Sequence, residues 1–275
     1  MFEILEKKQL NEQVFSLTIY APFIAKKVKP GQFVIIRIDE KGERIPLTVA
    51  DFDALSGSLT IIFQAVGYTT KRLSTLNKGD FITDCVGPLG RATEFGSPVK
   101  AIVIGGGVGC AIAYPQAKAL HNMGVNTTVI AGFRNKDIII LEEEMRKVSD
   151  SYFVTTDDGS YGEKGFVTDV LKKLIEKDTY DLVIAIGPIP MMKFVAKTTE
   201  QQSIKTIVSL NPIMIDGTGM CGGCRVTVGG RTKFACVDGP DFDGHQVDFD
   251  ELMRRNALYR EEEAHICRME GVLNG

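Results

Sequence analysis

The chain has 275 residues and a formal net charge of −3, with 44% hydrophobic and 24% charged residues. At roughly 100 to 200 residues per domain, this length predicts two domains with room for a small third. The 32 basic and 35 acidic residues leave no electrostatic footprint for nucleic acid, and the apolar fraction excludes a disordered chain.

The N-terminus places acidic residues at Glu3 and Glu6, where a signal peptide needs a basic region. The longest apolar runs, such as 101–104, are the length of a strand and far short of the ~20 residues that span a bilayer. We therefore expect a cytoplasmic protein with no membrane partner. Thiols stay reduced in that compartment, so neighbouring cysteines are more often metal ligands or redox groups than disulfides.

The first domain is expected to span residues 1–97. Short β-rich runs separated by turn residues predict strands at 13–20, 32–38, 58–64 and 80–86. Strands at such close spacing favour a small antiparallel barrel or sandwich.

The second domain is expected to span residues 98–213. Predicted strands at 99–104, 126–133, 152–156 and 182–186 alternate with helical segments that include 137–148 and 167–177. This alternation is typical of a doubly wound, Rossmann-like α/β fold with a parallel sheet.

The remaining segment, 214–275, differs from both domains. Six glycines fall within the fifteen residues 216–230, which no helix or strand interior tolerates cheaply. A charged helix is predicted from Phe249 to about Met269.

Three cysteines of this segment, Cys221, Cys224 and Cys236, follow a C-x2-C-x11-C pattern. The plant-type [2Fe–2S] pattern is C-x4-C-x2-C with a distant fourth cysteine. Overlaying it on this sequence places Asp216 where the first cysteine would be. The spacing therefore predicts a [2Fe–2S] cluster held by three thiolates and the Asp216 carboxylate.

Other roles for the cysteines stay open. Structural zinc also uses C-x2-C pairs with a later ligand, and the fourth ligand could be Cys267, another cysteine or solvent. Unligated buried thiols are a further alternative. Cys85 and Cys110 lie in segments that read as strand and helix, so we expect them to be small core residues.

A glycine-rich turn, 105–109, follows the first strand of the second domain. Glycines let a pyrophosphate approach the backbone, and a helix N-terminus offers N–H donors and a positive dipole. Cys110 holds the last position of the standard dinucleotide motif, so tight packing between strand and helix is the alternative. The candidate binding residues are Gly106, Gly107, Val108 and Gly109.

Charge near the next strand bears on the choice of nucleotide. Arg134 and Lys136 stand where an NAD site usually has an acid, and their positive charges favour a nucleotide with a 2′-phosphate. The alternative is that both are solvated charges of a loop. The turns 156–162 and 186–191 also follow predicted strands, where ligands bind in such sheets. Their candidate residues are Asp158, Gly159, Gly187, Pro188 and Met191.

Short motifs along essentially all 275 residues resemble the ferredoxin–NADP reductase superfamily. The motifs are Arg44-Ile-Pro-Leu-Thr48, Val66-Gly-Tyr-Thr-Thr70, Gly87-Pro-Leu-Gly90, Gly105-Gly-Gly-Val-Gly109, Gly187-Pro-Ile-Pro-Met191 and the set Asp216, Cys221, Cys224 and Cys236. The chain is most similar to the branch with the electron-transfer subunit of dihydroorotate dehydrogenase. Within that branch it is most similar to small subunits of NADH-dependent reduced ferredoxin:NADP⁺ oxidoreductases.

The resemblance implies a flavin-binding barrel that holds FAD. In the superfamily an R-x-Y-S type segment cradles the flavin. Thr48 matches the last position of that segment, so Ile45 holds the position expected for the arginine and Arg44 stands one residue too far away. Thr69 and Thr70 would bind the FAD pyrophosphate through their hydroxyls and a helix N-terminus. The alternative is that they only cap the helix. The residues carried over for FAD are Arg44, Pro46, Leu47, Thr48, Ile62, Gln64, Gly67, Thr69 and Thr70.

The function implied is an electron-transfer subunit in which NAD(H) exchanges a hydride with FAD, and FAD exchanges electrons with the cluster. Its partner would be a larger flavin and iron–sulfur subunit that binds NADP(H) and ferredoxin in an electron-bifurcating heterodimer. The resemblance favours NAD(H) here, with NADP(H) possible, and implies no catalytic acid or base.

Two alternatives remain at this point. A dihydroorotate dehydrogenase electron-transfer subunit is disfavoured by Asp216, because that branch normally has four cysteines. A zinc-stabilised, nucleotide-sensing interaction protein without turnover is the other.

Overall fold

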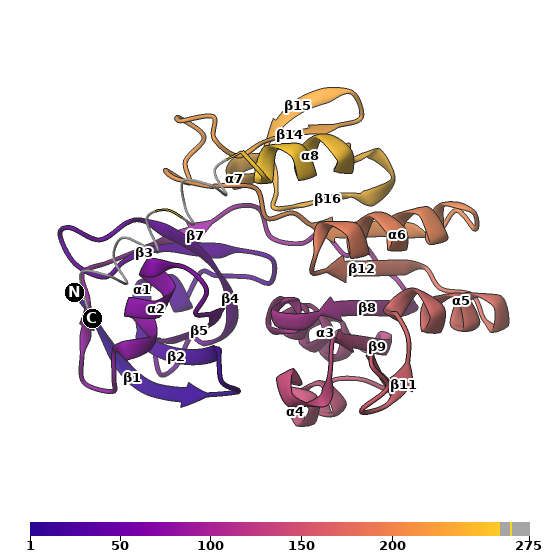
Figure 1. Cartoon of the computed structure of the whole chain (residues 1–275), viewed down its shortest axis with the longest axis horizontal. Coiled ribbons are helices and arrows are strands. Elements are labelled where there is room, and N and C mark those ends of the chain that lie inside the picture. The colour runs from indigo at the N-terminus through magenta and orange to yellow at the C-terminus, as the bar shows by residue number, and fades with distance from the viewer. Residues whose placement is uncertain (259–264, 266–275) are drawn as a thin grey trace.

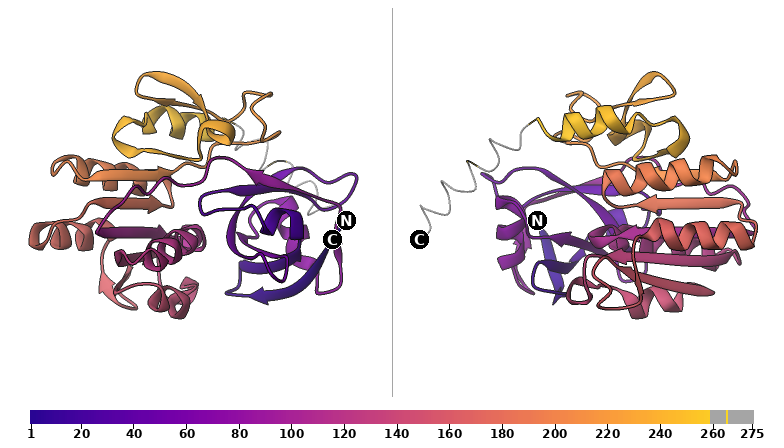
Figure 2. Two further views of the ribbon diagram at one scale, coloured as in Figure 1. Left: turned by 180° about the vertical axis from the view of Figure 1, so that it is seen from behind. Right: turned by 45° about the vertical axis from the view of Figure 1, so that its right-hand side comes forward.

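The computed structural model describes residues 1–258 and 265, and residues 259–264 and 266–275 lie outside the described residues. A barrel and an α/β domain lie side by side, and the cysteine-containing segment lies across one end of both (Figures 1 and 2). The expected fold class is confirmed in each of these parts.

The barrel is an antiparallel, nearly closed sheet. Its elements are β1 (Phe2–Gln9), β2 (Val14–Tyr20), α1 (Pro22–Ala25), β3 (Phe33–Arg37), β4 (Ile45–Asp53), β5 (Ser58–Gln64), α2 (Tyr68–Thr75), β6 (Phe81–Ile82) and β7 (Asp84–Leu89). The strand order is β6-β1-β2-β5-β4-β3-β7. Along β5, Leu59, Ile61 and Phe63 are buried in the barrel core, so the two-residue period turns Ile62 and Gln64 to the outer face.

The α/β domain is built on a mostly parallel sheet. Its elements are β8 (Lys100–Gly106), the 3₁₀ turn η1 (Gly107–Gly109), α3 (Cys110–Asn122), β9 (Asn126–Phe133), η2 (Lys136–Ile138), α4 (Glu142–Lys147), β10 (Ser151–Thr156), β11 (Glu163–Lys164), α5 (Val167–Lys177), β12 (Leu182–Ile186), α6 (Ile189–Glu200) and β13 (Lys205–Ser209). One core packs α3 and α4 on one face of the sheet, and a second core packs α5 and α6 on the other.

The last part adds to that sheet instead of standing apart from it. Its elements are β14 (Arg225–Val228), β15 (Arg231–Phe234), α7 (Ala235–Asp238), β16 (Asp241–Asp243), η3 (Gly244–Gln246) and α8 (Phe249–Asn256). β16 pairs antiparallel with β13 and extends the order to β11-β10-β9-β8-β12-β13-β16. This pairing anchors the cysteine segment to the sheet edge.

Two predicted helices differ from the structure. The segment 137–148 is a 3₁₀ turn followed by α4 from Glu142, because Leu141 adopts a positive φ of 56° and three acids occupy the first turn of α4. The helix predicted to reach Met269 ends at Asn256, and most of its remainder lies outside the described residues. Phe249 and Leu252 dock α8 on its own domain.

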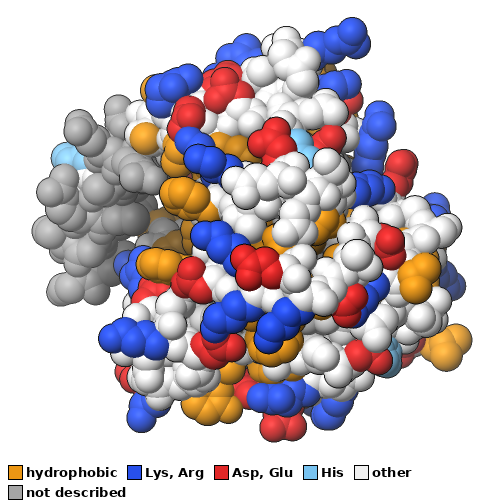
Figure 3. Space-filling model, turned by 90° about the vertical axis from the view of Figure 1, so that its right-hand side faces the viewer, with side chains coloured by type: hydrophobic (Ala, Val, Ile, Leu, Met, Phe, Trp, Pro, Cys, Tyr) orange, Lys and Arg blue, Asp and Glu red, His pale blue; other side chains and the backbone are white. Residues whose placement is uncertain are grey.

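No helix in the part of the chain that the structure describes is both long and apolar enough to span a membrane. On the face shown in Figure 3, basic and acidic side chains are interspersed over the surface.

The Asp241 carboxyl is enclosed where the three parts meet. Burial raises its pKa from 3.8 to about 6. When the pKa of an acid is higher in the folded protein than in the unfolded chain, the free energy of unfolding falls as pH rises from the unfolded-state pKa to the folded-state pKa. Ionisation of Asp241 should therefore lower the free energy of unfolding by about 3 kcal/mol above pH 6.

Asp241→Asn should remove that loss. Urea unfolding of both proteins between pH 3.8 and about 6 measures their free energies of unfolding. The variant should become increasingly more stable than the unmodified protein as pH rises. A difference independent of pH would contradict the expectation.

Candidate functional site

The carboxyl ends of the parallel strands bring the predicted nucleotide residues to one edge. β8 lies between β9 and β12, so the strand order reverses direction there. Ligands of doubly wound sheets bind at this kind of switch point. The turn 106–109 follows β8, and the turn 187–191 follows β12. The structure therefore places the two turns side by side, as the sequence predicted.

The glycines of the first turn serve different purposes. A Cβ atom at Gly106 would lie 2.5 Å from Met191 Sδ, and one at Gly109 would lie 2.5 Å from Ile186 O. These two glycines let the turns pack closely. Gly107 has a φ of +56°, and a Cβ there would have no neighbour within 4 Å. Gly107 therefore faces open space, as close approach of a ligand requires.

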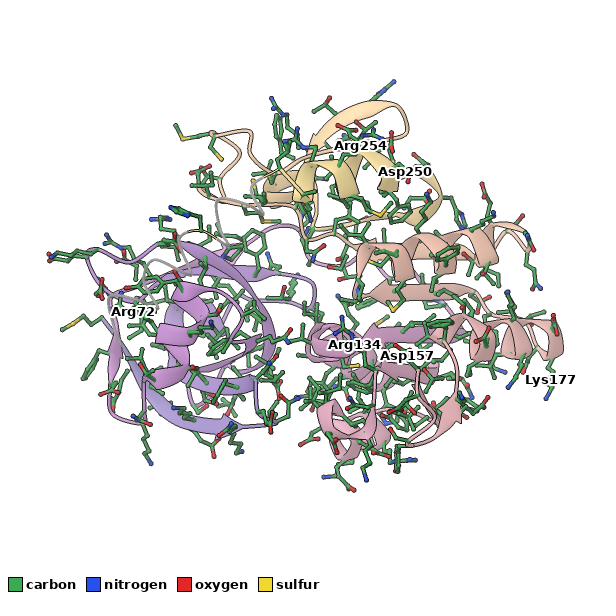
Figure 4. The ribbon with its side chains drawn as sticks, viewed as in Figure 1. Arg72, Arg134, Asp157, Lys177, Asp250 and Arg254 are labelled. Atoms are coloured by element: carbon green, nitrogen blue, oxygen red, sulfur yellow. The ribbon has the colours of Figure 1, made fainter. Side chains whose placement is uncertain are left out.

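The ends of β9 and β10 carry a basic and an acidic side chain close together. Arg134 and Asp157 are exposed at these ends, and the Asp157 amide donates to Phe133 O at 3.0 Å (Figure 4). Asp158 accepts from the Ser160 amide at 2.9 Å, and Ser160 lowers the pKa of the Asp158 carboxyl. The predicted residue Asp158 is thus engaged in its own turn. Asp157, which was not among the residues predicted to bind the nucleotide, is a second exposed acid in this turn, and the Asp158 amide donates to Arg134 O at 3.3 Å.

The strand that carries the predicted flavin residues, β4, lies between β5 and β3 in the barrel sheet. Residues 45–48 of β4 are half-buried, and the preceding Arg44 is exposed. In the antiparallel register Pro46 pairs with Ile35 of β3, and Thr48 pairs with Phe33.

The predicted pyrophosphate site lies at the start of α2. Thr70 Oγ1 accepts from the backbone N–H groups of Gly67 at 3.0 Å and Val66 at 3.1 Å. Thr69 donates its hydroxyl to Glu43 Oε2 at 2.5 Å. Capping therefore accounts for the Thr70 side chain. The donors left for a phosphate are the backbone N–H groups of the first turn, which have no acceptor within a helix.

The outer face of β5 brings the two predicted nucleotide sites together. β5 contacts the glycine turn η1, and Ile62 packs against the core of the nucleotide sheet. Gln64 donates to Gln13 Oε1 at 3.0 Å on the same face. The residues predicted to meet the flavin thus adjoin the turn predicted to bind the nicotinamide nucleotide.

Two cysteines of the predicted cluster site are already in contact. Cys224 Sγ and Cys236 Sγ lie 3.2 Å apart, and the Cys236 amide approaches Cys224 Sγ at 3.4 Å. Both are buried in a small core that includes Phe33 and Ile35 of the barrel. The thiol pair is therefore packed directly on β3, the neighbour of the predicted flavin strand.

The other two predicted ligands, Cys221 and Asp216, lie in the glycine-rich loop outside the buried thiol pair, and Asp216 is half-buried. Cys221 is exposed, and a hydrogen bond from the Gly223 amide lowers its pKa, which favours the thiolate. Asp216 Oδ2 accepts from the amides of Thr218 at 3.0 Å and Met220 at 3.1 Å. Among the described residues, no three His, Cys, Asp or Glu side chains converge on one metal position.

The donor set nevertheless fits a cluster. It combines a buried thiol pair, an exposed cysteine that favours the thiolate, and backbone amides aimed at sulfur, which are the surroundings of iron–sulfur clusters. Burial raises the pKa of Cys85 and Cys110 to about 12, and both lie in separate cores, as expected for core residues. Cys267 lies outside the described residues.

Family models match two parts of the chain. Residues 103–197 match the oxidoreductase NAD-binding domain, and residues 211–248 match the iron–sulfur cluster binding domain of dihydroorotate dehydrogenase B. The fold and these domains define the class of protein, which is an electron-transfer oxidoreductase with the ferredoxin–NADP reductase fold.

Relatives along the whole chain narrow this class. The chain is 50% identical over 261 residues to a homologue of the dihydroorotate dehydrogenase B (NAD⁺) electron-transfer subunit from Thermotoga maritima, covering 95% of this chain and 92% of the relative. A solved structure of NADH-dependent reduced ferredoxin–NADP oxidoreductase matches with 48% identity, a TM-score of 0.94, and 99% and 98% of the two chains.

The ferredoxin reductase of carbazole 1,9a-dioxygenase shares the fold at 19% identity and a TM-score of 0.63, covering 74% of this chain and 64% of that one. The relatives show that this chain belongs to the family of dihydroorotate dehydrogenase B electron-transfer subunits and their homologues.

Proposed function

We propose that the chain carries electrons between NAD(H), FAD and a [2Fe–2S] cluster, as the small subunit of an NADH-dependent ferredoxin:NADP⁺ oxidoreductase. A larger flavin and iron–sulfur subunit would be its partner and would reach ferredoxin and NADP(H). The 48% identical solved structure supports this choice. Asp216 favours it over a dihydroorotate dehydrogenase subunit, because that branch normally has a cysteine there.

One observation carries the proposal: the three predicted sites converge on one sheet of the barrel. The Cys224–Cys236 pair packs on Phe33 and Ile35 of β3. Residues 33 and 35 pair with Thr48 and Pro46 of β4, and neighbouring strands lie about 4.8 Å apart. On the other side, β5 meets the glycine turn η1. This arrangement supports a path that runs from the nucleotide through the flavin to the cluster.

When bound, FAD would supply the chemistry that links two-electron exchange with NAD(H) to single-electron exchange with a [2Fe–2S] cluster. The chain positions the groups and excludes water. We assign residues 1–97 to FAD, 98–213 to NAD(H) and 214–275 to the cluster, with β16 joining the last two parts. The site residues that we propose are those predicted from the sequence, together with Asp157.

We expect NADH to reduce the bound flavin faster than NADPH does. The exposed Asp157 carboxylate beside Arg134 should repel a 2′-phosphate and accept hydrogen bonds from a ribose diol. Stopped-flow reduction with each nucleotide measures the preference. Asp157→Asn should narrow it, whereas Asp150→Asn, at the opposite end of the same strand, is the control. A clear preference for NADPH in the unmodified protein would overturn the choice of nucleotide.

Asp216→Cys is expected to keep the cluster and shift its reduction potential. A carboxylate is a harder ligand than a thiolate and favours ferric iron, so the substitution changes the balance between the two oxidation states. Electron paramagnetic resonance of the reduced protein, combined with a redox titration, measures the change. An unchanged spectrum and potential would show that Asp216 is not a ligand.

A further inference from the structure

One carboxyl oxygen connects all three parts of the molecule. Asp241 belongs to β16, the strand that ties the cysteine segment to the sheet edge. Its Oδ2 accepts from Thr93 Oγ1 at 2.5 Å and from Gln116 Nε2 at 3.5 Å. Thr93 lies in the connection between the barrel and β8, and Gln116 lies on α3. The redox steps proposed above make no use of this carboxyl.

The side chains of Asp241, Thr93 and Gln116 together have fewer hydrogen-bond donors than enclosed acceptors. Gln116 Nε2 donates to Thr93 Oγ1 at 2.7 Å as well as to Asp241, which uses both amide protons. Two enclosed oxygens, Asp241 Oδ1 and Gln116 Oε1, have no donor within the described residues. A buried acceptor without a donor is unfavourable. A proton on Asp241 Oδ1 would turn one of these unpaired acceptors into a neutral hydroxyl and so lower the cost of enclosing the carboxyl.

Among the described residues, no cation stabilises the ionised form of Asp241. Desolvation raises the pKa of the Asp241 carboxyl to about 6, and the polar groups of Thr93, Ser209 and Gln116 near the carboxyl lower it. Four charged side chains on the neighbouring elements have partners elsewhere. Arg91 donates to Val237 O, Lys118 to Asp51, and Lys205 to the backbone carbonyl of Glu94, while Asp243 accepts from the His245 amide.

We propose that Asp241 is a positioning residue whose protonated form holds the cysteine segment against both cofactor domains, and whose ionised form loosens that junction. Electron transfer from flavin to cluster depends on this placement, because the thiol pair packs on the barrel at the small core that includes Phe33 and Ile35 of β3. The proposal builds on the proposed function and adds a pH-dependent control to it.

The test uses the full-length protein with its cofactors. Rapid mixing with NADH separates flavin reduction from the later reduction of the cluster. The second rate should fall as pH rises through about 6. Asp241→Asn keeps a neutral donor and acceptor, so its second rate should stay near the acidic limit at every pH. Asp241→Ala should be slow throughout. Asp243→Asn, an exposed position on the same strand, should titrate like the unmodified protein.

Hydrogen exchange of the β13–β16 amides, corrected for the intrinsic pH effect, gives a readout that needs no redox chemistry. Protection should decrease as pH rises from about 4 to about 6 in the unmodified protein, level off above pH 6, and stay constant in Asp241→Asn. Equal pH dependence of exchange in both proteins would overturn the proposal, and so would an Asn variant as slow as the Ala variant. Failure of NADH to reduce the flavin would instead overturn the proposed function, while the exchange experiment would still decide the role of Asp241.

Discussion

Replacing Cys236 with alanine is expected to remove essentially all cluster iron from the protein. Cys236 is one half of the buried thiol pair, 3.2 Å from Cys224. Without Cys236, Cys224 is the single buried thiolate of the site, because Cys221 is exposed and Asp216 is a half-buried carboxylate. Iron and sulfide analysis of the anaerobically purified variant measures the loss.

Cys110→Ala is the matched control, because Cys110 is equally buried but lies in the core of the nucleotide sheet. It should keep its iron and lose about 1 kcal/mol of stability through the small cavity. The same metal analysis separates iron from zinc in the unmodified protein. Full iron in Cys236→Ala would show that the thiol pair is not a ligand pair, and stoichiometric zinc would support a structural metal site.

Gly109→Ala is expected to destabilise the fold and weaken NADH binding together. Its new Cβ would lie 2.5 Å from Ile186 O, so the start of α3 must move away from the turn after β12. Overpacking of this kind costs about 1–3 kcal/mol. Because the same shift displaces the helix N-terminus, the dissociation constant of NADH should rise by about tenfold or more.

Gly107→Ala separates packing from ligand approach. Its Cβ would meet no atom within 4 Å, so only the positive φ opposes it, at about 1–2 kcal/mol. It should weaken NADH binding with a smaller loss of stability than Gly109→Ala. Thermal unfolding and equilibrium NADH titration measure the two effects. A Gly107→Ala protein that binds NADH like the unmodified one would mean that the turn serves only packing.

Patterns with a strong local signal were predictable from the sequence. The alternation of β5, the apolar run of β8 and the helix α5 follow periodicities that hydrophobic burial imposes. The spacing of Cys221, Cys224 and Cys236 also predicts a metal site without knowledge of the fold, because metal ligands must meet at one point. The pairing of Cys224 with Cys236 is consistent with that prediction, while the role of Asp216 stays a prediction.

Features that depend on tertiary pairing could not be predicted in this way. β16 has only three residues and no periodic pattern, and it exists because β13 offers an open edge. The buried position of the Asp241 carboxyl follows from that pairing. Asp157 was overlooked because its place beside Arg134 depends on the parallel register of β9 and β10. The short helix α4 likewise reflects the left-handed residue Leu141.

The most direct test of the central claim is an anaerobic NADH titration of the purified protein with its cofactors, followed by visible absorption and electron paramagnetic resonance. We predict that the flavin bands bleach first and that the signal of a reduced [2Fe–2S] cluster then appears within the same chain. Flavin reduction without any cluster signal in an iron-loaded protein, or no bleaching at all, would contradict the proposed path of electrons.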